Sequence, residues 1–272
     1  MKKDSGIVKW LLIALCAVFL VAPLVLPLVY VVVTAIRDGW NAYVKSVTDT
    51  YAVKSILLTL EVVAITVVVN TIFGVFAAWI ITKFTFRGKK IISTLIDLPL
   101  AISPIIAGLI FVLTFGRQSF LYPYLEKAGV QIIFAVPGIV LATIFVTFPF
   151  ISREIIPVLT AAGSDEEEAA AMMGANGFQI FTQITFPHIK WALLYGIVLC
   201  SARAMGEFGA VSVLSGHLRG ITNTMPLYIE LLYQAFDFTG AFAMSSILVV
   251  MAVIILVLRN ILEYRGQKEG DA

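Results

Sequence analysis

Charge and the residues of nucleophilic or metal chemistry are both scarce in this sequence. Only 13% of its 272 residues are Asp, Glu, Lys or Arg, which is about half the share found in an ordinary soluble domain. Two cysteines and two histidines are too few for a disulfide framework, a zinc site or a Ser-His-Asp triad. The net charge of +2 is too small for a nucleic-acid-binding surface. We therefore predict no catalytic residue, no metal site and no nucleic-acid partner.

The chain is rich in apolar sequence instead, with 60% hydrophobic residues and a mean hydropathy of +0.98. A membrane-spanning helix needs about 20 mostly apolar residues. Six runs meet this requirement, at residues 10–36, 55–82, 91–116, 130–152, 191–215 and 238–260. The first run is longer than the apolar core of a signal peptide, which has about 7–15 residues, so we expect it to be retained. The predicted fold is an all-α membrane protein with six transmembrane helices in one domain, residues 1–272.

Lys and Arg are distributed unevenly over the connections between the six runs. If the N-terminus lies inside the cell, the inner segments carry twelve of these residues and the outer segments carry six. Loops rich in Lys and Arg stay on the cytoplasmic side of a membrane. The sequence therefore predicts a multi-pass protein with both termini in the cytoplasm.

The longest inner segment, residues 153–190, contains signals for two short helices. Ser164 followed by Glu167 has the spacing of a capping box, and a row of four acidic residues suits the first turn of a helix. Gly174 then provides a stop, because glycine readily adopts the left-handed conformation that ends helices. These features alone leave two alternatives open, a docking helix for a partner and a linker helix lying on the membrane.

This segment resembles the EAA loop of ABC-importer permeases, whose pattern is E-A-A-x3-G-x9-I-x-L-P. The residues that match the pattern are Glu168, Ala169, Ala170, Gly174, Ile184 and Pro187. Phe186 replaces the leucine and keeps that position apolar. The resemblance implies the type I ABC importer permease fold, in which the first short helix is a coupling helix that docks on a cytoplasmic ATPase. It assigns the matching residues to this coupling, and we add Met172 and Met173, because flexible methionines adapt to an irregular groove.

Apart from Arg259 at the end of the sixth run, four charged residues fall inside the six runs, namely Glu61, Asp97, Arg203 and Glu207. A charge at bilayer depth costs at least about 2.5–3.5 kcal/mol, so such residues face the bundle interior and find partners. Arg203 and Glu207 are four residues apart and would share one helix face. They either neutralise each other or line the path of a polar solute. Glu61 and Asp97 are alternative partners for Arg203, or they lie near helix ends within reach of water.

Small residues and prolines mark the fifth and third runs. Gly206 and Gly209 would let helices pack closely in lipid. Pro99 and Pro104 predict either a simple kink or a broken helix, and broken helices at membrane depth often line substrate sites. The candidate translocation or gate residues are therefore Arg203, Gly206, Glu207, Gly209, Asp97, Pro99 and Pro104. We hypothesise that Arg203 organises the gate rather than contacting the solute.

A second resemblance covers nearly the whole chain. Residues 95–111, 142–159 and 201–220 are similar to the oxyanion branch of ABC permeases, with a G-E-F-G-A core at 206–210. The likeness is nearest to the W-type subunits of sulfate/thiosulfate importers of the bacterial inner membrane. It implies a related permease subunit as partner, two cytoplasmic ATPases that hold ATP and Mg, and an extracytoplasmic sulfate/thiosulfate-binding protein. This chain would bind no cofactor, because it lacks the G-x-x-x-x-G-K-[ST] phosphate loop.

Three other functions are compatible with these residues. Molybdate and tungstate permeases share the core at 206–210, so this core does not fix the anion. An ion-coupled secondary transporter would use the four intramembrane charges as a relay and would work without ATP. A scaffold membrane subunit without a transport path would tolerate changes in both the inner loop and the fifth run. Deletion of residues 164–174 separates these functions, because only the ABC importer would lose its ATPase.

Overall fold

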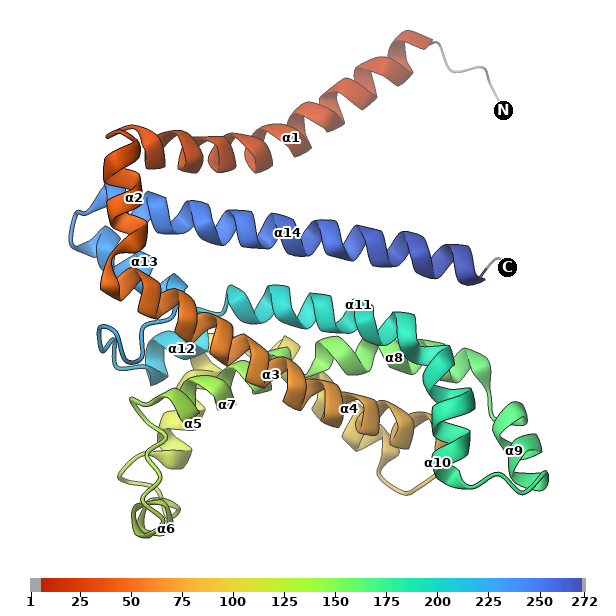
Figure 1. Cartoon of the computed structure of the whole chain (residues 1–272). Coiled ribbons are helices and arrows are strands. Elements are labelled where there is room, and N and C mark those ends of the chain that lie inside the picture. Colours follow the sequence, from red (N-terminus) through yellow and green to blue (C-terminus); the bar gives the residue numbers. More distant parts are fainter. Residues whose placement is uncertain (1–5, 271–272) are drawn as a thin grey trace.

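The computed structural model describes residues 6–270, and every regular element in that range is helical (Figure 1). The elements are α1 (Gly6–Ile36), α2 (Trp40–Thr48), α3 (Thr50–Lys83), α4 (Lys89–Ala101), α5 (Pro104–Phe115), α6 (Tyr122–Lys127), α7 (Val136–Thr147), α8 (Pro149–Ala162), α9 (Asp165–Met172), α10 (Gly177–Ile180), the π-helical turn η1 (Phe181–Thr185), α11 (Phe186–Met205), α12 (Gly209–Leu214), α13 (Met225–Gln234) and α14 (Phe238–Gly270).

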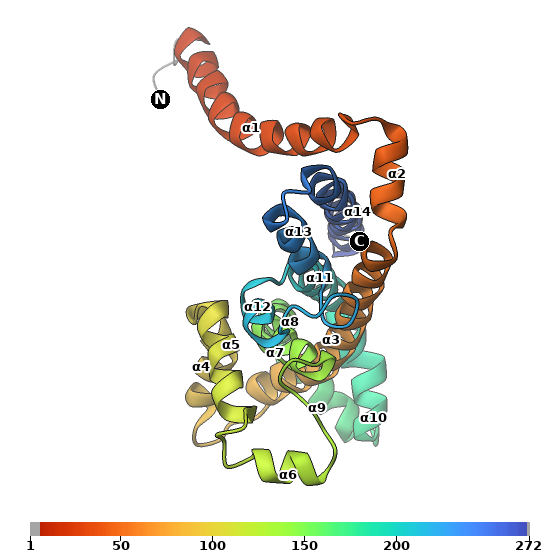
Figure 2. The same cartoon turned by 90° about the vertical axis from the view of Figure 1, so that its left-hand side faces the viewer.

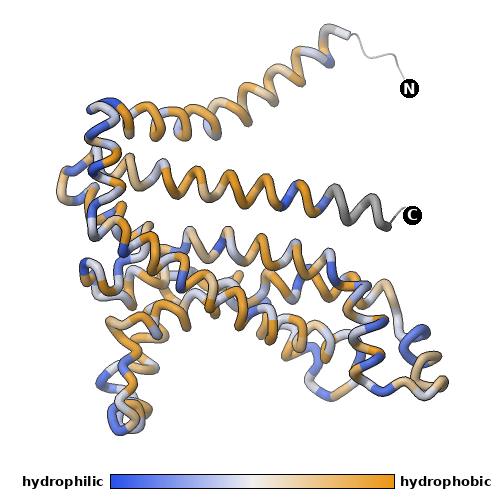
Figure 3. The backbone as a smooth tube through the Cα atoms, in the orientation of Figure 1, coloured by the Kyte–Doolittle hydropathy of each residue, from blue (hydrophilic) through white to orange (hydrophobic). Residues whose placement is uncertain are grey.

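Five helical segments of the described chain are long and apolar enough to cross a membrane, and α4 with α5 makes a sixth if this bent pair is one span. These segments correspond to the six predicted runs. Figure 3 shows apolar residues along most of α1, α3 and α14, whereas polar residues gather at the ends of the bundle. The structure confirms an all-helical membrane protein. It corrects the bounds of the third, fourth and fifth spans.

The third predicted span, residues 91–116, is not one helix. α4 ends at Ala101, α5 begins at Pro104, and the pair is bent by 110°. Ile102 and Ser103 have extended backbone, with ψ of 135° and 133°. The residue before a proline avoids the helical region, and proline lacks the N–H that would continue the helix. Of the two predicted alternatives, the break at Pro104 is confirmed, while Pro99 lies inside α4 without interrupting it.

The fourth span differs from its predicted bounds, residues 130–152, at both ends. The helix begins at Val136 with Pro137 in its first turn, where a proline needs no intrahelical donor. It continues through α8, so that α7 and α8 form one long membrane-spanning segment. The prediction that Arg153 opens the inner loop is therefore wrong. Arg153 lies within a helix, and the inner connection starts only at Gly163.

The fifth predicted span, residues 191–215, is divided at Gly206. α11 begins earlier than predicted and ends just before this glycine, and α12 is a separate short helix. Glycine is a poor residue for continuing a helix. The break is held by Glu207, whose Oε1 accepts a hydrogen bond of 2.8 Å from the backbone N–H of Ala210. Arg203 and Glu207 therefore do not share the face of one continuous helix.

The two ends of the described chain lie at the same end of the bundle as α9 and α10 (Figure 1). The short helices α2, α6 and α13 lie at the opposite end. Seen from that opposite end in Figure 2, α2 and α3 lie on one side of the molecule and α4 and α5 on the other. α1 packs mainly against α14 and exposes apolar side chains along most of its length.

α8 is wedged between α3 and α11. Ile151 of α8 is fully buried, and a glycine faces it from each neighbour. A Cβ atom on Gly74 would lie 3.1 Å from the Ile151 side chain, and one on Gly196 would lie 3.0 Å from the Ile151 Cα atom. Small residues allow such close approach of helices in lipid. This packing fixes α8, and with it Arg153, against α3 and α11.

Candidate docking helix and intramembrane ion pairs

Helix α9 is attached to the bundle through its acidic first turn. The carboxylate of Glu167 lies 3.0 Å from Lys83 Nζ at the end of α3, and it accepts a hydrogen bond of 2.7 Å from the hydroxyl of Thr185. Lys83 also donates to the carbonyl oxygen of Gly163. The Lys83 and Glu167 side chains are only 10% and 17% exposed. These contacts join α9 to α3 and to the turn that precedes α11.

The predicted capping box between Ser164 and Glu167 is wrong. Ser164 makes no hydrogen bond to the backbone of the first turn, and its hydroxyl instead donates to Glu168 Oε1 at 2.9 Å. Glu167 is unavailable for capping because Lys83 holds its carboxylate. A capping box does occur one helix later, where Asn176 and the third residue of α10 bond to each other's backbone N–H. The N-x-x-Q spacing in the sequence was the signal for it.

The end of α9 follows the prediction for Gly174, which has a φ of +91°. The N–H of Ala175 bonds to the carbonyl of Ala170, and the N–H of Gly174 bonds to that of Ala171, both at 3.0 Å. This is the Schellman arrangement, in which a left-handed residue lets the chain satisfy the last carbonyls of a helix. The chain reverses here, so α9 and α10 form one compact projection from the bundle.

The outer surface of α9 is apolar as well as acidic. Met172 and Met173 are almost fully exposed, and Glu168 and Ala169 are exposed beside them, while Ala170 is buried against the bundle. Ile184 is half-buried in η1, and Pro187 lies exposed in the first turn of α11. Two methionines held in water at the tip of a rigid projection are suited to a groove on a partner.

Arg203 and Glu207 form an ion pair at the break between α11 and α12. Arg203 Nη1 lies 2.6 Å from Glu207 Oε2, and the two side chains are 31% and 1% exposed. The other oxygen of Glu207 caps α12, as described above. Both carboxylate oxygens are thus engaged, and they hold the chain across the break between α11 and α12.

The start of α12 packs directly onto α5. A Cβ atom on Gly209 would lie 2.9 Å from Pro104 Cβ, and a Cβ atom on Gly108 would lie 2.7 Å from the carbonyl oxygen of Ala210. Gly206 has no comparable neighbour, because its nearest contact would be at 3.9 Å. The two broken spans therefore meet at their breaks, and Gly108, which the sequence did not single out, makes their contact possible.

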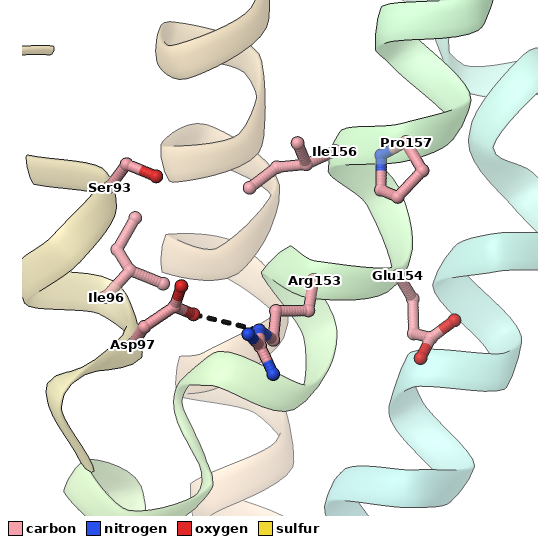
Figure 4. A pocket seen from close by; sticks show the side chains of 7 residues that line it. All are labelled: Ser93, Ile96, Asp97, Arg153, Glu154, Ile156 and Pro157. Carbon is pink, nitrogen blue, oxygen red and sulfur yellow. Dashed lines mark ion pairs between the residues drawn. The ribbon is translucent and has the colours of Figure 1, made fainter. Parts of the chain in front are cut away.

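Asp97 does not pair with Arg203. Its Oδ1 lies 2.9 Å from Nε of Arg153, across the gap between α4 and α8 (Figure 4). These side chains are 43% and 56% exposed, and they line a cavity of about 430 Å³ that also includes Glu154. Glu61, the other proposed partner of Arg203, is exposed on α3. Arg153 was not among the predicted site residues, because the predicted fourth span ended at residue 152 and Arg153 was assigned to the loop that follows.

A larger cavity of about 560 Å³ lies at the opposite end of the bundle and was not predicted. Lys45, Asp49, Arg219 and Tyr228 are among its lining residues. The phenol of Tyr228 donates to Asp49 Oδ2 at 3.3 Å. Burial, together with the negative charge of Asp49, raises the pKa of Tyr228 to about 12. Tyr228 therefore remains a neutral donor at physiological pH.

Residues 70–267 match the family described as the binding-protein-dependent transport system inner membrane component. The chain is 44% identical over 261 residues to the sulfate transport system permease protein CysW of Escherichia coli (strain K12), covering 96% of this chain and 90% of that protein. It is 43% identical over 258 residues to the CysW protein of Synechocystis sp. (strain ATCC 27184 / PCC 6803 / Kazusa), covering 95% and 94%. The Escherichia coli (strain K12) permease protein CysT is 32% identical over 242 residues, covering 89% and 87%.

The fold is also similar to a solved structure of a bacterial alginate ABC transporter in complex with an alginate pentasaccharide-bound periplasmic protein. The TM-score is 0.77 at 19% sequence identity, over 94% of this chain and 95% of that one. This likeness shows the fold alone, while the family match and the identity to permease proteins agree along most of the sequence. The chain belongs to the binding-protein-dependent transport system inner membrane components, the membrane permeases of ABC importers.

Proposed function

We propose that this chain is one permease subunit of an ATP-driven importer that moves sulfate or thiosulfate across the bacterial inner membrane. The observation that carries this proposal is its 44% identity, over 96% of its length, to a protein named as a sulfate transport permease. The chain itself would bind no cofactor. ATP and Mg would be held by separate ATPase subunits, and an extracytoplasmic protein would deliver the anion.

The second permease subunit is proposed to be a related chain of the CysT type, to which this chain is 32% identical. The long apolar surface of α1 supports a partner inside the membrane, since α1 contacts few helices of its own chain. Both termini are proposed to be cytoplasmic, because they lie at the end of the bundle that carries α9. The excess of Lys and Arg in the same segments supports this orientation.

Helix α9 is proposed to dock on the ATPase and to transmit its movement. Glu168, Ala169, Met172 and Met173 would form the exposed contact, while the buried first turn would carry force into the bundle through Glu167. Because Lys83 belongs to α3 and Thr185 precedes α11, movement of α9 would turn two membrane helices at once. The two permease subunits would then pass from the inward-facing to the outward-facing state as rigid bodies. The Arg203–Glu207 pair and the contact between α5 and α12 are proposed to act as the gate.

Reconstitution tests the proposal. The complete transporter is assembled in proteoliposomes, and ATP hydrolysis is measured with binding protein loaded with sulfate, thiosulfate or molybdate. We expect stimulation by sulfate or thiosulfate and uptake that requires ATP. Stimulation by molybdate alone would reassign the substrate, and sulfate uptake without ATP would identify a secondary transporter instead.

Deletion of residues 164–174 tests the docking role separately. The purified permease pair is incubated with the ATPase, and the amount of bound ATPase is measured. We expect the deletion to abolish association while the permease pair still forms. Normal association of the deletion variant would contradict the coupling role of α9.

A further inference from the structure

The cavity between α4 and α8 contains Arg153, whose side chain is 56% exposed, whereas Arg203 of the other intramembrane ion pair is 31% exposed. Figure 4 shows the guanidinium group of Arg153 directed toward Asp97 of α4, whereas the carboxylate of Glu154, the next residue of α8, points away from Arg153. The cavity has a volume of about 430 Å³. Ser93 adds a hydroxyl group to its lining.

The cavity belongs to the half of the bundle that carries α9. Nine residues separate Arg153 from the end of α8 at Ala162, which is about 14 Å at a helical rise of about 1.5 Å per residue. Asp97 lies eight residues after the start of α4 at Lys89, at a similar depth. Under the proposed orientation, this cavity lies on the cytoplasmic side of the contact between α5 and α12.

Arg153 retains donors for a ligand. Its Nε lies 2.9 Å from Asp97 Oδ1, and a guanidinium carries five N–H donors in a planar fork. With 56% of the side chain exposed, the η nitrogens face the cavity. Guanidinium forks match the oxygen spacing of tetrahedral oxyanions and bind them with charge-assisted hydrogen bonds. Arg203 is less accessible, because its side chain is 31% exposed and pairs with a Glu207 side chain that is 1% exposed.

We propose that this cavity is a low-affinity oxyanion site on the inner half of the translocation path, where Arg153 binds the transported anion and Asp97 competes for Arg153. The proposal rests on the proposed function, since it takes the transported solute to be sulfate or a similar dianion. Transport requires a site that binds well enough to receive an ion and weakly enough to release it. Asp97 supplies the weakening, because its carboxylate repels a dianion and recovers the guanidinium when the anion leaves.

A purely structural role for the Asp97–Arg153 pair makes a different prediction. If the pair only braces α4 against α8, removal of either partner breaks the brace, and Asp97→Asn and Arg153→Gln damage transport equally. If Arg153 binds the anion, Arg153→Gln removes the ligand, whereas Asp97→Asn removes the competitor. The two substitutions then act in opposite directions on anion affinity from the inner side.

The test uses the complete transporter in proteoliposomes and measures sulfate uptake together with inhibition of uptake by sulfate on the inner side. We expect Arg153→Gln to lower uptake about tenfold or more, because a hydrogen bond to a charged group is worth roughly one to two orders of magnitude in binding. We expect Asp97→Asn to assemble and transport, and to be inhibited by inner sulfate at a concentration several-fold lower than wild type. Arg117→Gln, which changes an exposed arginine at the opposite end of the bundle, is the matched control.

If the Arg153→Gln transporter fails to assemble, the same two measurements are made on Arg153→Lys. Lysine keeps the charge and loses the fork, so uptake should fall by less than tenfold and inner sulfate should inhibit more weakly. Equal loss of uptake in Asp97→Asn and Arg153→Gln, or an unchanged response of Asp97→Asn to inner sulfate, overturns the proposal. Absence of ATP-dependent sulfate uptake by the wild-type complex would instead count against the proposed function.

Discussion

Two ion pairs inside the membrane spans differ in burial and in what holds them. Arg203 and Glu207 come from the same chain segment, and Glu207 is 1% exposed with both oxygens engaged. Arg153 and Asp97 come from different helices and are 56% and 43% exposed at the edge of a cavity. The Coulomb attraction between two charges at about 3 Å depends strongly on the surrounding dielectric. The first pair therefore stabilises the break between α11 and α12, whereas the second can exchange its partner for a solute.

The difference shows that an intramembrane charge does not by itself indicate a substrate contact. The Arg203–Glu207 pair, with both carboxylate oxygens in contact with a neighbour, exposes less of its arginine to a ligand, and breaking it carries a large desolvation cost. An open pair of moderate exposure contributes little to stability. Four substitutions are expected to lower the stability of the protein by decreasing amounts. The first and the last compare the two ion pairs directly.

The largest effect on stability is expected for Glu207→Ala. It removes the cap of α12 and leaves Arg203 without its carboxylate, so the free energy of unfolding should fall by about 3 kcal/mol or more. Unfolding in detergent micelles under increasing denaturant measures this change. Glu61→Gln, which alters an exposed acid on α3, is the control and should remain within about 0.5 kcal/mol. A Glu207→Ala protein as stable as wild type would show that the pair does not hold the break.

The next effect is expected at the contact between α5 and α12. Gly108→Ala places a Cβ atom 2.7 Å from the carbonyl oxygen of Ala210, and such overpacking costs about 1–3 kcal/mol. Gly206→Ala is the matched control, because its nearest contact would be at 3.9 Å. Thermal unfolding of the two variants side by side measures the difference. Equal destabilisation would indicate that α5 and α12 are not in close contact.

A smaller effect is expected for Lys83→Met, since Lys83 and Glu167 are 10% and 17% exposed. Loss of this partly buried pair should lower the free energy of unfolding by about 1 kcal/mol. The sensitive measurement is the amount of sulfate transported per ATP hydrolysed, which should fall because α9 is no longer joined to α3. Lys45→Met changes a lysine at the opposite end of the bundle and provides the control. An unchanged ratio in Lys83→Met would remove Lys83 from the coupling path.

The smallest effect on stability is expected for Asp97→Asn. An exposed ion pair contributes a median of about 0–1 kcal/mol, so the unfolding transition should stay close to that of the wild-type protein. Denaturant unfolding of Asp97→Asn beside Glu207→Ala gives the most direct contrast between the two pairs. Destabilisation of Asp97→Asn by about 3 kcal/mol would mean that the Asp97–Arg153 pair is a structural brace, as Arg203–Glu207 is.

Local sequence signals predicted the C-terminal end of α9 correctly but predicted the wrong contacts at its N-terminal end. Gly174 ends the helix as expected, because a left-handed residue there depends only on neighbouring backbone. The Ser164–Glu167 capping box was equally plausible from spacing, yet Glu167 turns to Lys83, which is 84 positions earlier in the chain. A capping bond and a buried ion pair compete for one carboxylate, and only the three-dimensional neighbours determine which contact forms.

The six spans and the inner docking loop could be predicted because hydropathy and charge bias act over long stretches and average out local errors. The breaks could not all be predicted with the same accuracy. Pro104 interrupts its span and Pro99 does not, although both stand in the same run. Arg153 was assigned to a loop because a charge usually marks the end of a span, and here Asp97 of another helix makes the charge tolerable.

The sequence by itself determined that the chain crosses a membrane in helices, that the segment resembling the EAA loop lies between the fourth and fifth spans, and that α9 ends before Gly174. These properties follow from composition, periodicity and short-range backbone preferences. Only the tertiary structure decided which charges pair, which glycines receive a neighbouring helix, and which arginine faces a cavity. Such contacts join residues far apart in the chain, and their energies depend on burial and geometry that no local stretch of sequence contains.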